Sequence, residues 1–225
     1  VASITAGAAT AVRGVAPGVD LLSVRVITDE GGGNAFTLAK GITEAVDRGA
    51  ELLCICLASR GGNAVLETAI QYATERDVTI VAAAGNDALL GVSYPARYTH
   101  VIAVPAVDAK GEHLYFSNRG TELDVAAPGA GVAASRSEGD AILFSGTSAA
   151  APFVAGAVAA LLAENPELEP DAIAALLTRY SNDTGAPGDD ESFGSGILAV
   201  GRLMARDIGG VYAMAAMAPH IAYDE

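Results

Sequence analysis

The most informative stretch of this sequence is Phe144-Ser-Gly-Thr-Ser-Ala-Ala-Ala-Pro-Phe-Val-Ala-Gly156. It lies within a run, between Asp140 and Glu164, that contains no acidic or basic residue. Large apolar residues recur there at helical spacing and the other positions are mostly Ala or Gly, which predicts a helix that is apolar on every side and therefore buried. Ser and Thr residues typical of a helix start place Ser148 at its N-terminus. Unpaired N–H groups and a partial positive charge at that end suit a developing oxyanion.

Length and composition indicate one α/β domain with a large core. The chain has 225 residues, of which 51% are hydrophobic, and a net charge of −14. This negative charge argues against nucleic acid and anionic membranes as partners. We also expect no membrane span, because we find no apolar run of the required length. The first residues lack the features of a secretory signal peptide.

Segments typical of strands and of helices alternate along the chain. Besides the central helix, the patterns predict strands at 20–27, 51–57, 78–84, 101–107 and 123–127, and helices at 36–48, 63–75 and 171–180. Their short connections predict an α/β fold with a mainly parallel sheet and helices on both faces. Ligands bind such sheets beyond the carboxyl ends of the strands, where we expect Asn86 and Ser148. We predict one domain over residues 1–207, followed by a tail or arm of unknown role at 208–225.

The central stretch resembles the nucleophile motif of the subtilisin-like serine peptidases (subtilases), Gly-Thr-Ser-x-Ala-x-Pro-x-Val-x-Gly. The matching residues are Gly146, Thr147, Ser148, Ala150, Pro152, Val154 and Gly156. Other stretches are similar to family segments in the same order: Gly14–Pro17, Ala82–Asn86, Tyr94–Ala96, Phe116–Gly120 and Ala127–Gly129. The resemblance implies a subtilisin-like three-layer sandwich and a cis peptide bond before Pro95.

The resemblance also implies roles for single residues. Ser148 is the expected catalytic nucleophile, and the Asn86 side chain and the Ser148 backbone N–H are the expected oxyanion donors. A peptide substrate is expected to lie as an extended strand between two backbone segments, Gly31-Gly32-Gly33 and Cys56-Leu57-Ala58-Ser59. Further expected substrate-binding residues are Ala83, Ala84, Gly85 and Ser93, the last deep in a medium-sized, uncharged pocket. The family usually has glycine where this chain has Ala58, whose Cβ lies in the expected path of the peptide.

The family's catalytic base is a histidine in the motif His-Gly-Thr-x-Val-Ala, oriented by an aspartate further upstream. This chain begins at Val1-Ala2, as if cut directly after His-Gly-Thr-x, so we expect an N-terminally truncated domain without either residue. His100 and His113 are predicted to be surface residues, and His220 is assigned no role.

These observations leave two hypotheses. In the first, the chain is most of a serine endopeptidase that needs a missing N-terminal segment and hydrolyses peptides very poorly alone. In the second, it is a catalytically incomplete relative that binds an extended peptide or has a structural role. The intact Ser148 and Asn86 favour the first hypothesis, whereas Cys54, Cys56 and Ala58 favour the second.

No cofactor is required for the expected chemistry. Structural calcium is common in the family, and Asp29-Glu30 and Asp189-Asp190-Glu191 are candidates by charge alone, but a solvated surface is the other interpretation and we assign no metal site. Cys54 and Cys56 point to the same side of a strand and are a poor disulfide pair, so we interpret them as small, buried apolar residues. Localisation stays open, because secretion is typical of the family and two unpaired cysteines are compatible with the cytoplasm.

Overall fold

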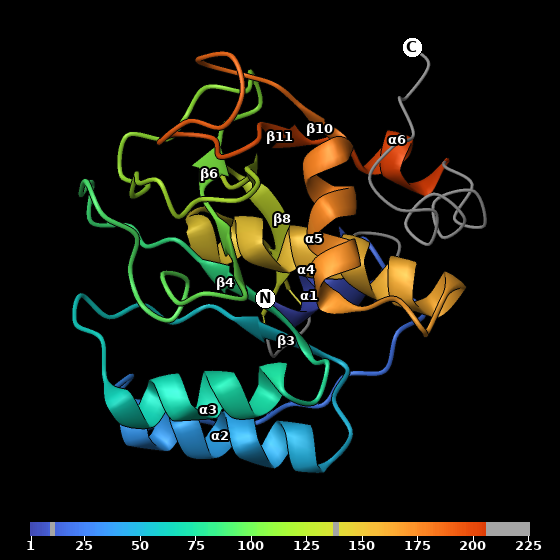
Figure 1. Cartoon of the computed structure of the whole chain (residues 1–225). Coiled ribbons are helices and arrows are strands. Elements are labelled where there is room, and N and C mark those ends of the chain that lie inside the picture. Colours follow the sequence, from blue (N-terminus) through green and yellow to red (C-terminus); the bar gives the residue numbers. More distant parts are fainter. Residues whose placement is uncertain (10–11, 137–139, 206–225) are drawn as a thin grey trace, which may run out of the picture.

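The computed structural model describes residues 1–9, 12–136 and 140–205, and these residues form three layers (Figure 1). The middle layer is a parallel sheet of β3 (Leu52–Ile55), β4 (Thr79–Ala83) and β5 (Val101–Val104). The helices α2 (Ala35–Asp47) and α3 (Ala64–Thr74) cover one face of the sheet. The helix α4 (Thr147–Glu164) covers the other, with α5 (Pro170–Arg179) packed against it. This arrangement confirms the predicted three-layer α/β fold.

Shorter elements extend the sheet and carry the chain toward α4. Pro105 separates β5 from β6 (Ala106–Val107), which pairs in parallel with β7 (Ala127–Pro128). An antiparallel hairpin of β8 (Val132–Ser135) and β9 (Ala141–Phe144) leads directly into α4. The other elements are α1 (Ala2–Ala6), β1 (Ala8–Ala9), β2 (Val12–Arg13), β10 (Ser181–Asn182), β11 (Ile197–Leu198) and α6 (Val200–Met204).

The core has two halves because successive side chains of a strand point to opposite faces of the sheet. On β4, Val81 and Ala83 pack toward α4, whereas Ile80 and Ala82 pack toward α2 and α3. The helix α4 is buried along most of its length, as predicted. It is also long and apolar enough to cross a membrane by length and composition, so our prediction that no run has that length was wrong. Its burial between the sheet and α5 is that of a core helix.

Two predicted strands differ from the structure. Residues 20–27 form no strand, because within the described chain they have no ladder partner; their valines pack beside α2 instead, where Gly41 leaves room for Val26. Of the predicted strand at 123–127, only Ala127 belongs to a strand, β7, and Val125 and Ala126 form isolated β-bridges. Phe36 and Val65, each in the first turn of a helix, are 63% and 47% exposed. The predicted tail at 208–225 lies outside the described residues.

Candidate active site

Ser148 lies in the first turn of α4 and is half-buried. Gly146 is the N-cap residue, with a φ of 144° that favours glycine, and its N–H donates to Gly129 O at 2.8 Å. The Ser148 hydroxyl donates to the backbone carbonyl of Cys56 at 3.4 Å. Within the described residues no acceptor is found for the Ser148 backbone N–H, as expected for an amide at a helix N-terminus. This amide is therefore available to a ligand.

Pro152 explains a second contact between Ser148 and Cys56. In an α-helix the carbonyl of Ser148 accepts from the N–H four residues later, but Pro152 has no N–H to donate. The Cys56 thiol donates to this carbonyl instead, with 3.6 Å between sulfur and oxygen. Cys56 thus holds Ser148 both by its hydroxyl and by its carbonyl.

The side chain of Asn86 is oriented by Thr147. Its Oδ1 accepts from Thr147 N at 2.9 Å and from Thr147 Oγ1 at 3.0 Å, and this buried hydroxyl also accepts from Gly85 N at 3.3 Å. Because Oδ1 accepts both of these hydrogen bonds, the Nδ2 group of Asn86 points elsewhere as the donor of this side chain. An atom at the Cβ position of Gly146 would lie 3.4 Å from Asn86 Nδ2 and 3.7 Å from Ser148 N. Two hydrogen-bond donors therefore lie near one point beside Gly146, and the oxyanion role of Asn86 and Ser148 stays a prediction.

A fully buried amide, that of Asn118, anchors the loop that carries Asn86. Its Nδ2 donates to Ala84 O at 3.2 Å and to Ser93 Oγ at 3.0 Å. Its Oδ1 accepts from Asp87 N at 3.0 Å and Leu89 N at 3.1 Å, just beyond Asn86. In the sequence, Asn118 stands out only as part of the stretch Phe116–Gly120. Its role was not found because the groups it joins lie 25 to 34 residues away.

Part of the predicted substrate site is assembled around this loop. Ser93 is buried and donates its N–H to Ala84 O at 2.9 Å, and Ala83, Ala84 and Gly85 are buried beside it. Tyr94 exchanges two backbone hydrogen bonds with Ser59, at 2.9 and 2.8 Å, which ties the Cys56–Ser59 segment to the pocket turn. The Tyr94–Pro95 peptide bond is cis, as predicted.

The two predicted substrate segments differ in their relation to Ser148. Cys56 contacts Ser148, Leu57 is half-buried and Ala58 is exposed, so this segment continues from the nucleophile toward solvent. Gly31, Gly32 and Gly33 lie in an exposed loop closed by a hydrogen bond from Thr28 N to Gly32 O at 2.8 Å. Within the described residues no contact joins this loop to Ser148, so its substrate role stays a prediction.

Cys54 and Cys56 are free thiols whose sulfurs lie 3.9 Å apart. Both residues are half-buried, which corrects the prediction of buried apolar packing alone. The hydrogen bond between the thiols and the burial of the pair raise the pKa of Cys54. The same hydrogen bond, donated to Cys56, lowers the pKa of Cys56.

Neither described histidine has a recorded contact with Ser148. His100 is 53% exposed, as predicted, with its Nδ1 4.0 Å from Asp171 Oδ1. The prediction that His113 lies at the surface was wrong. Both of its ring nitrogens are buried and find no hydrogen-bond partner among the described residues, and its ring meets Phe193 edge-on at 5.9 Å. Burial, followed by the charge of Arg119, lowers the pKa of His113. His220 lies outside the described residues.

The acidic loops organise their own backbone. Asp190 accepts from Ser192 N at 2.7 Å, Phe193 N at 2.9 Å and Ala186 N at 2.9 Å. Asp29, in the other loop, is paired with Arg25. Across the parts of the chain that the structure describes, no three His, Cys, Asp or Glu side chains are grouped to hold a metal ion.

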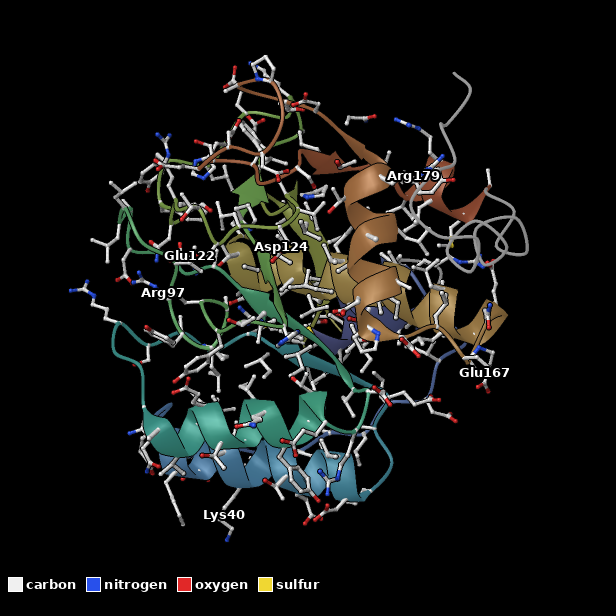
Figure 2. The ribbon with its side chains drawn as sticks, viewed as in Figure 1. Lys40, Arg97, Glu122, Asp124, Glu167 and Arg179 are labelled. Atoms are coloured by element: carbon white, nitrogen blue, oxygen red, sulfur yellow. The ribbon has the colours of Figure 1, made fainter. Side chains whose placement is uncertain are left out.

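The carboxyl of Asp124 is half-buried and has a raised pKa. In Figure 2 the label of Asp124 lies over the middle of the ribbon, whereas Lys40 points outward from α2. Asp124 Oδ2 accepts from Ala103 N at 2.7 Å, and burial raises the pKa of this carboxyl to about 6 despite that hydrogen bond. Arg97 and Glu122, also labelled in Figure 2, form an ion pair at 3.0 Å on the rim of the molecule.

Known proteins resemble this chain in sequence. A family model described as "Subtilase family" matches residues 1–196. A thermostable alkaline protease of Halalkalibacterium halodurans is 35% identical over 191 residues, covering 85% of this chain and 52% of that protein. Subtilisin DY of Bacillus licheniformis is 35% identical over 195 residues, covering 85% and 70%. The chain thus spans about half the length of the first relative.

Solved structures resemble it as well. The self-cleaved protease domain of PatA superimposes with a TM-score of 0.82 at 31% identity, covering 90% of this chain and 79% of that one. The prenylagaramide maturation protease PagA gives a TM-score of 0.77 at 30% identity, covering 86% and 75%. The matched nucleophile stretch, the three-layer fold and these relatives agree, and the chain belongs to the subtilase family of serine proteases.

Proposed function

We propose that this chain carries the nucleophile and the oxyanion hole of a serine endopeptidase. The observation that supports this most directly is that Asn86 Nδ2 and Ser148 N, the backbone amide of the proposed nucleophile, lie near one point beside Gly146. Ser148 Oγ attacks the carbonyl carbon of the scissile peptide bond, and the oxygen that becomes negative binds these two donors. Collapse of this intermediate expels the amine and leaves an acyl group on Ser148, which water then hydrolyses.

The substrate is proposed to be a peptide in extended conformation. It runs along the Cys56–Ser59 segment, which leads away from Ser148, and its second neighbour is the loop of Gly31, Gly32 and Gly33. The side chain that precedes the scissile bond is proposed to lie beside Ala83–Gly85 and Ser93, which are uncharged residues. Ala58 narrows the path of the peptide at the rim.

The reaction also needs a base. A serine hydroxyl is a weak nucleophile until a neighbouring group accepts its proton. The recorded hydrogen bond of Ser148 Oγ goes to the Cys56 carbonyl, which can orient the hydroxyl but cannot accept its proton as a base. We place the histidine base and the aspartate that orients it in polypeptide outside these 225 residues.

Labelling with a fluorophosphonate tests this proposal. A protein that includes the polypeptide upstream of Val1 should be labelled rapidly at Ser148, and the 225-residue chain should be labelled very slowly. Asn86→Leu in the longer protein should lower kcat for a peptide by about 10²–10³-fold, and Ser148→Ala should abolish labelling. If the longer protein binds an extended peptide but shows neither labelling nor turnover, the proposal fails and the chain is a peptide-binding module.

A further inference from the structure

Cys54 and Cys56 form a second cluster of reactive groups beside Ser148. Cys54 lies in β3 and Cys56 directly follows this strand, and both side chains pack toward α4. The two sulfurs are 3.9 Å apart, and neither cysteine is in a disulfide. Both residues are only partly buried.

A disulfide between these cysteines does not fit the strand. A disulfide needs Cβ atoms about 3.5–4.5 Å apart. Residues two apart in an extended strand are separated by about 6.6 Å and their Cβ atoms point the same way. Closing the bond would bend β3, where Cys54 is paired with Val81 of β4 in the parallel ladder. The strand therefore preserves two thiols side by side.

A soft metal ion fits the same two sulfurs. A bond from zinc to a thiolate is about 2.3 Å long, and with bonds of that length two thiolates on one ion lie about 3.8 Å apart at a tetrahedral angle and about 4.6 Å apart in a linear arrangement. The observed 3.9 Å lies within this range, and less than about 1 Å of side-chain adjustment reaches its linear end. Thiolates select soft ions such as Cu(I), Ag(I) and Hg(II) over calcium and magnesium. We propose that Cys54 and Cys56 bind one soft metal ion between their sulfurs.

Binding changes the surroundings of Ser148. Each thiol releases its proton to solvent as its sulfur bonds to the ion. The Cys56 sulfur then has no S–H to donate to the Ser148 carbonyl, the carbonyl that Pro152 leaves without its helical donor. An occupied site should therefore slow acylation of Ser148. This last consequence rests on the proposed function, whereas metal binding itself does not.

Calorimetric titration of the reduced chain with silver(I) nitrate, in chloride-free buffer, tests the site. One silver ion should bind per chain and about two protons should be released. Cys54→Ser and Cys56→Ser should each bind silver at least about 100-fold more weakly, because the second thiol acts at a high effective concentration. Ser148→Ala should bind like the unaltered chain, so a failure of the peptidase proposal leaves this result unchanged.

Two results would overturn the inference. One is the binding of two silver ions per chain; the other is unchanged affinity in either single cysteine variant. Circular dichroism shows whether each variant is folded. X-ray absorption at the silver edge of the unaltered chain needs no variant at all, and it should show two sulfur neighbours on the ion. A single sulfur neighbour there contradicts the proposal.

Discussion

Replacing Asn118 by leucine should destabilise the protein strongly, although Asn118 lies outside the nucleophile motif. Leucine has a similar size but can neither donate nor accept a hydrogen bond. The change removes four hydrogen bonds, those to Ala84 O, Ser93 Oγ, Asp87 N and Leu89 N. The loop that carries Asn86 therefore loses the side-chain hydrogen bonds that connect it, through Asn118, to Ala84 at the end of β4 and to Ser93.

The size of the effect follows from what each partner can do afterwards. A hydrogen bond contributes about 1 kcal/mol net, and more when a buried partner is left unpaired. Asp87 and Leu89 are exposed, so water can replace Asn118 at their amides. Ala84 O still accepts from Ser93 N, but Ser93 Oγ is buried and loses its donor. We expect a loss of about 3 kcal/mol in the free energy of unfolding.

Urea unfolding of the chain followed by circular dichroism measures this loss without any need for activity. Asn34→Ala is a matched control, because the Asn34 side chain caps α2 by accepting from Thr37 N at 2.9 Å. Removing this exposed cap should cost about 1 kcal/mol. Hydrogen exchange at the Asp87 and Leu89 amides should accelerate only in Asn118→Leu. The reasoning is refuted if Asn118→Leu costs no more than Asn34→Ala.

Two other changes test the electrostatics. The pKa of Asp124 is raised from 3.8 to about 6 in the folded state. Between these two pH values the folded protein keeps this proton and the unfolded protein has lost it. The free energy of unfolding therefore falls as the pH rises through this range. Asp124→Asn should remove this fall, and its unfolding free energy in urea should exceed that of the unaltered chain by up to about 3 kcal/mol at pH 7 but not at pH 3. Arg60 and Asp87 form an exposed ion pair at 3.0 Å, and a double-mutant cycle with Arg60→Gln and Asp87→Asn should give a coupling below about 1 kcal/mol. A coupling free energy above this value that does not fall with added salt would contradict the description of Arg60 and Asp87 as a solvent-screened surface pair.

The elements that sequence could predict are those whose signal is local. The buried strands β3, β4 and β5 are continuous apolar runs, and α4 is a long charge-free segment with a specific motif at its start. Elements that are buried on both sides must be apolar at nearly every position, so they appear in the sequence as continuous apolar runs. The positions of Ser148 and Asn86 at adjacent ends of α4 and β4 followed from the same reasoning.

What sequence could not predict depends on contacts between distant segments. The contact of Thr147 with Asn86 joins residues 61 apart, and the contacts of Cys56 with Ser148 join residues 92 apart. The segment 20–27 alternates like a strand, but pairing needs a neighbouring edge that a pattern alone does not reveal. His113 occurs in a polar turn, yet Phe193 covers its ring from another part of the chain.

The distance along the chain between the parts of the site has a consequence for biosynthesis. Cys56 and Asn86 leave the ribosome long before Ser148, and α4 is also joined to α1 by a buried hydrogen bond from Thr5 Oγ1 to Pro152 O across 147 residues. Folding that depends on such non-local contacts is slow. A partly synthesised chain therefore has neither the nucleophile nor the helix that presents it. The site can therefore be assembled only after residues 147–164 have been synthesised.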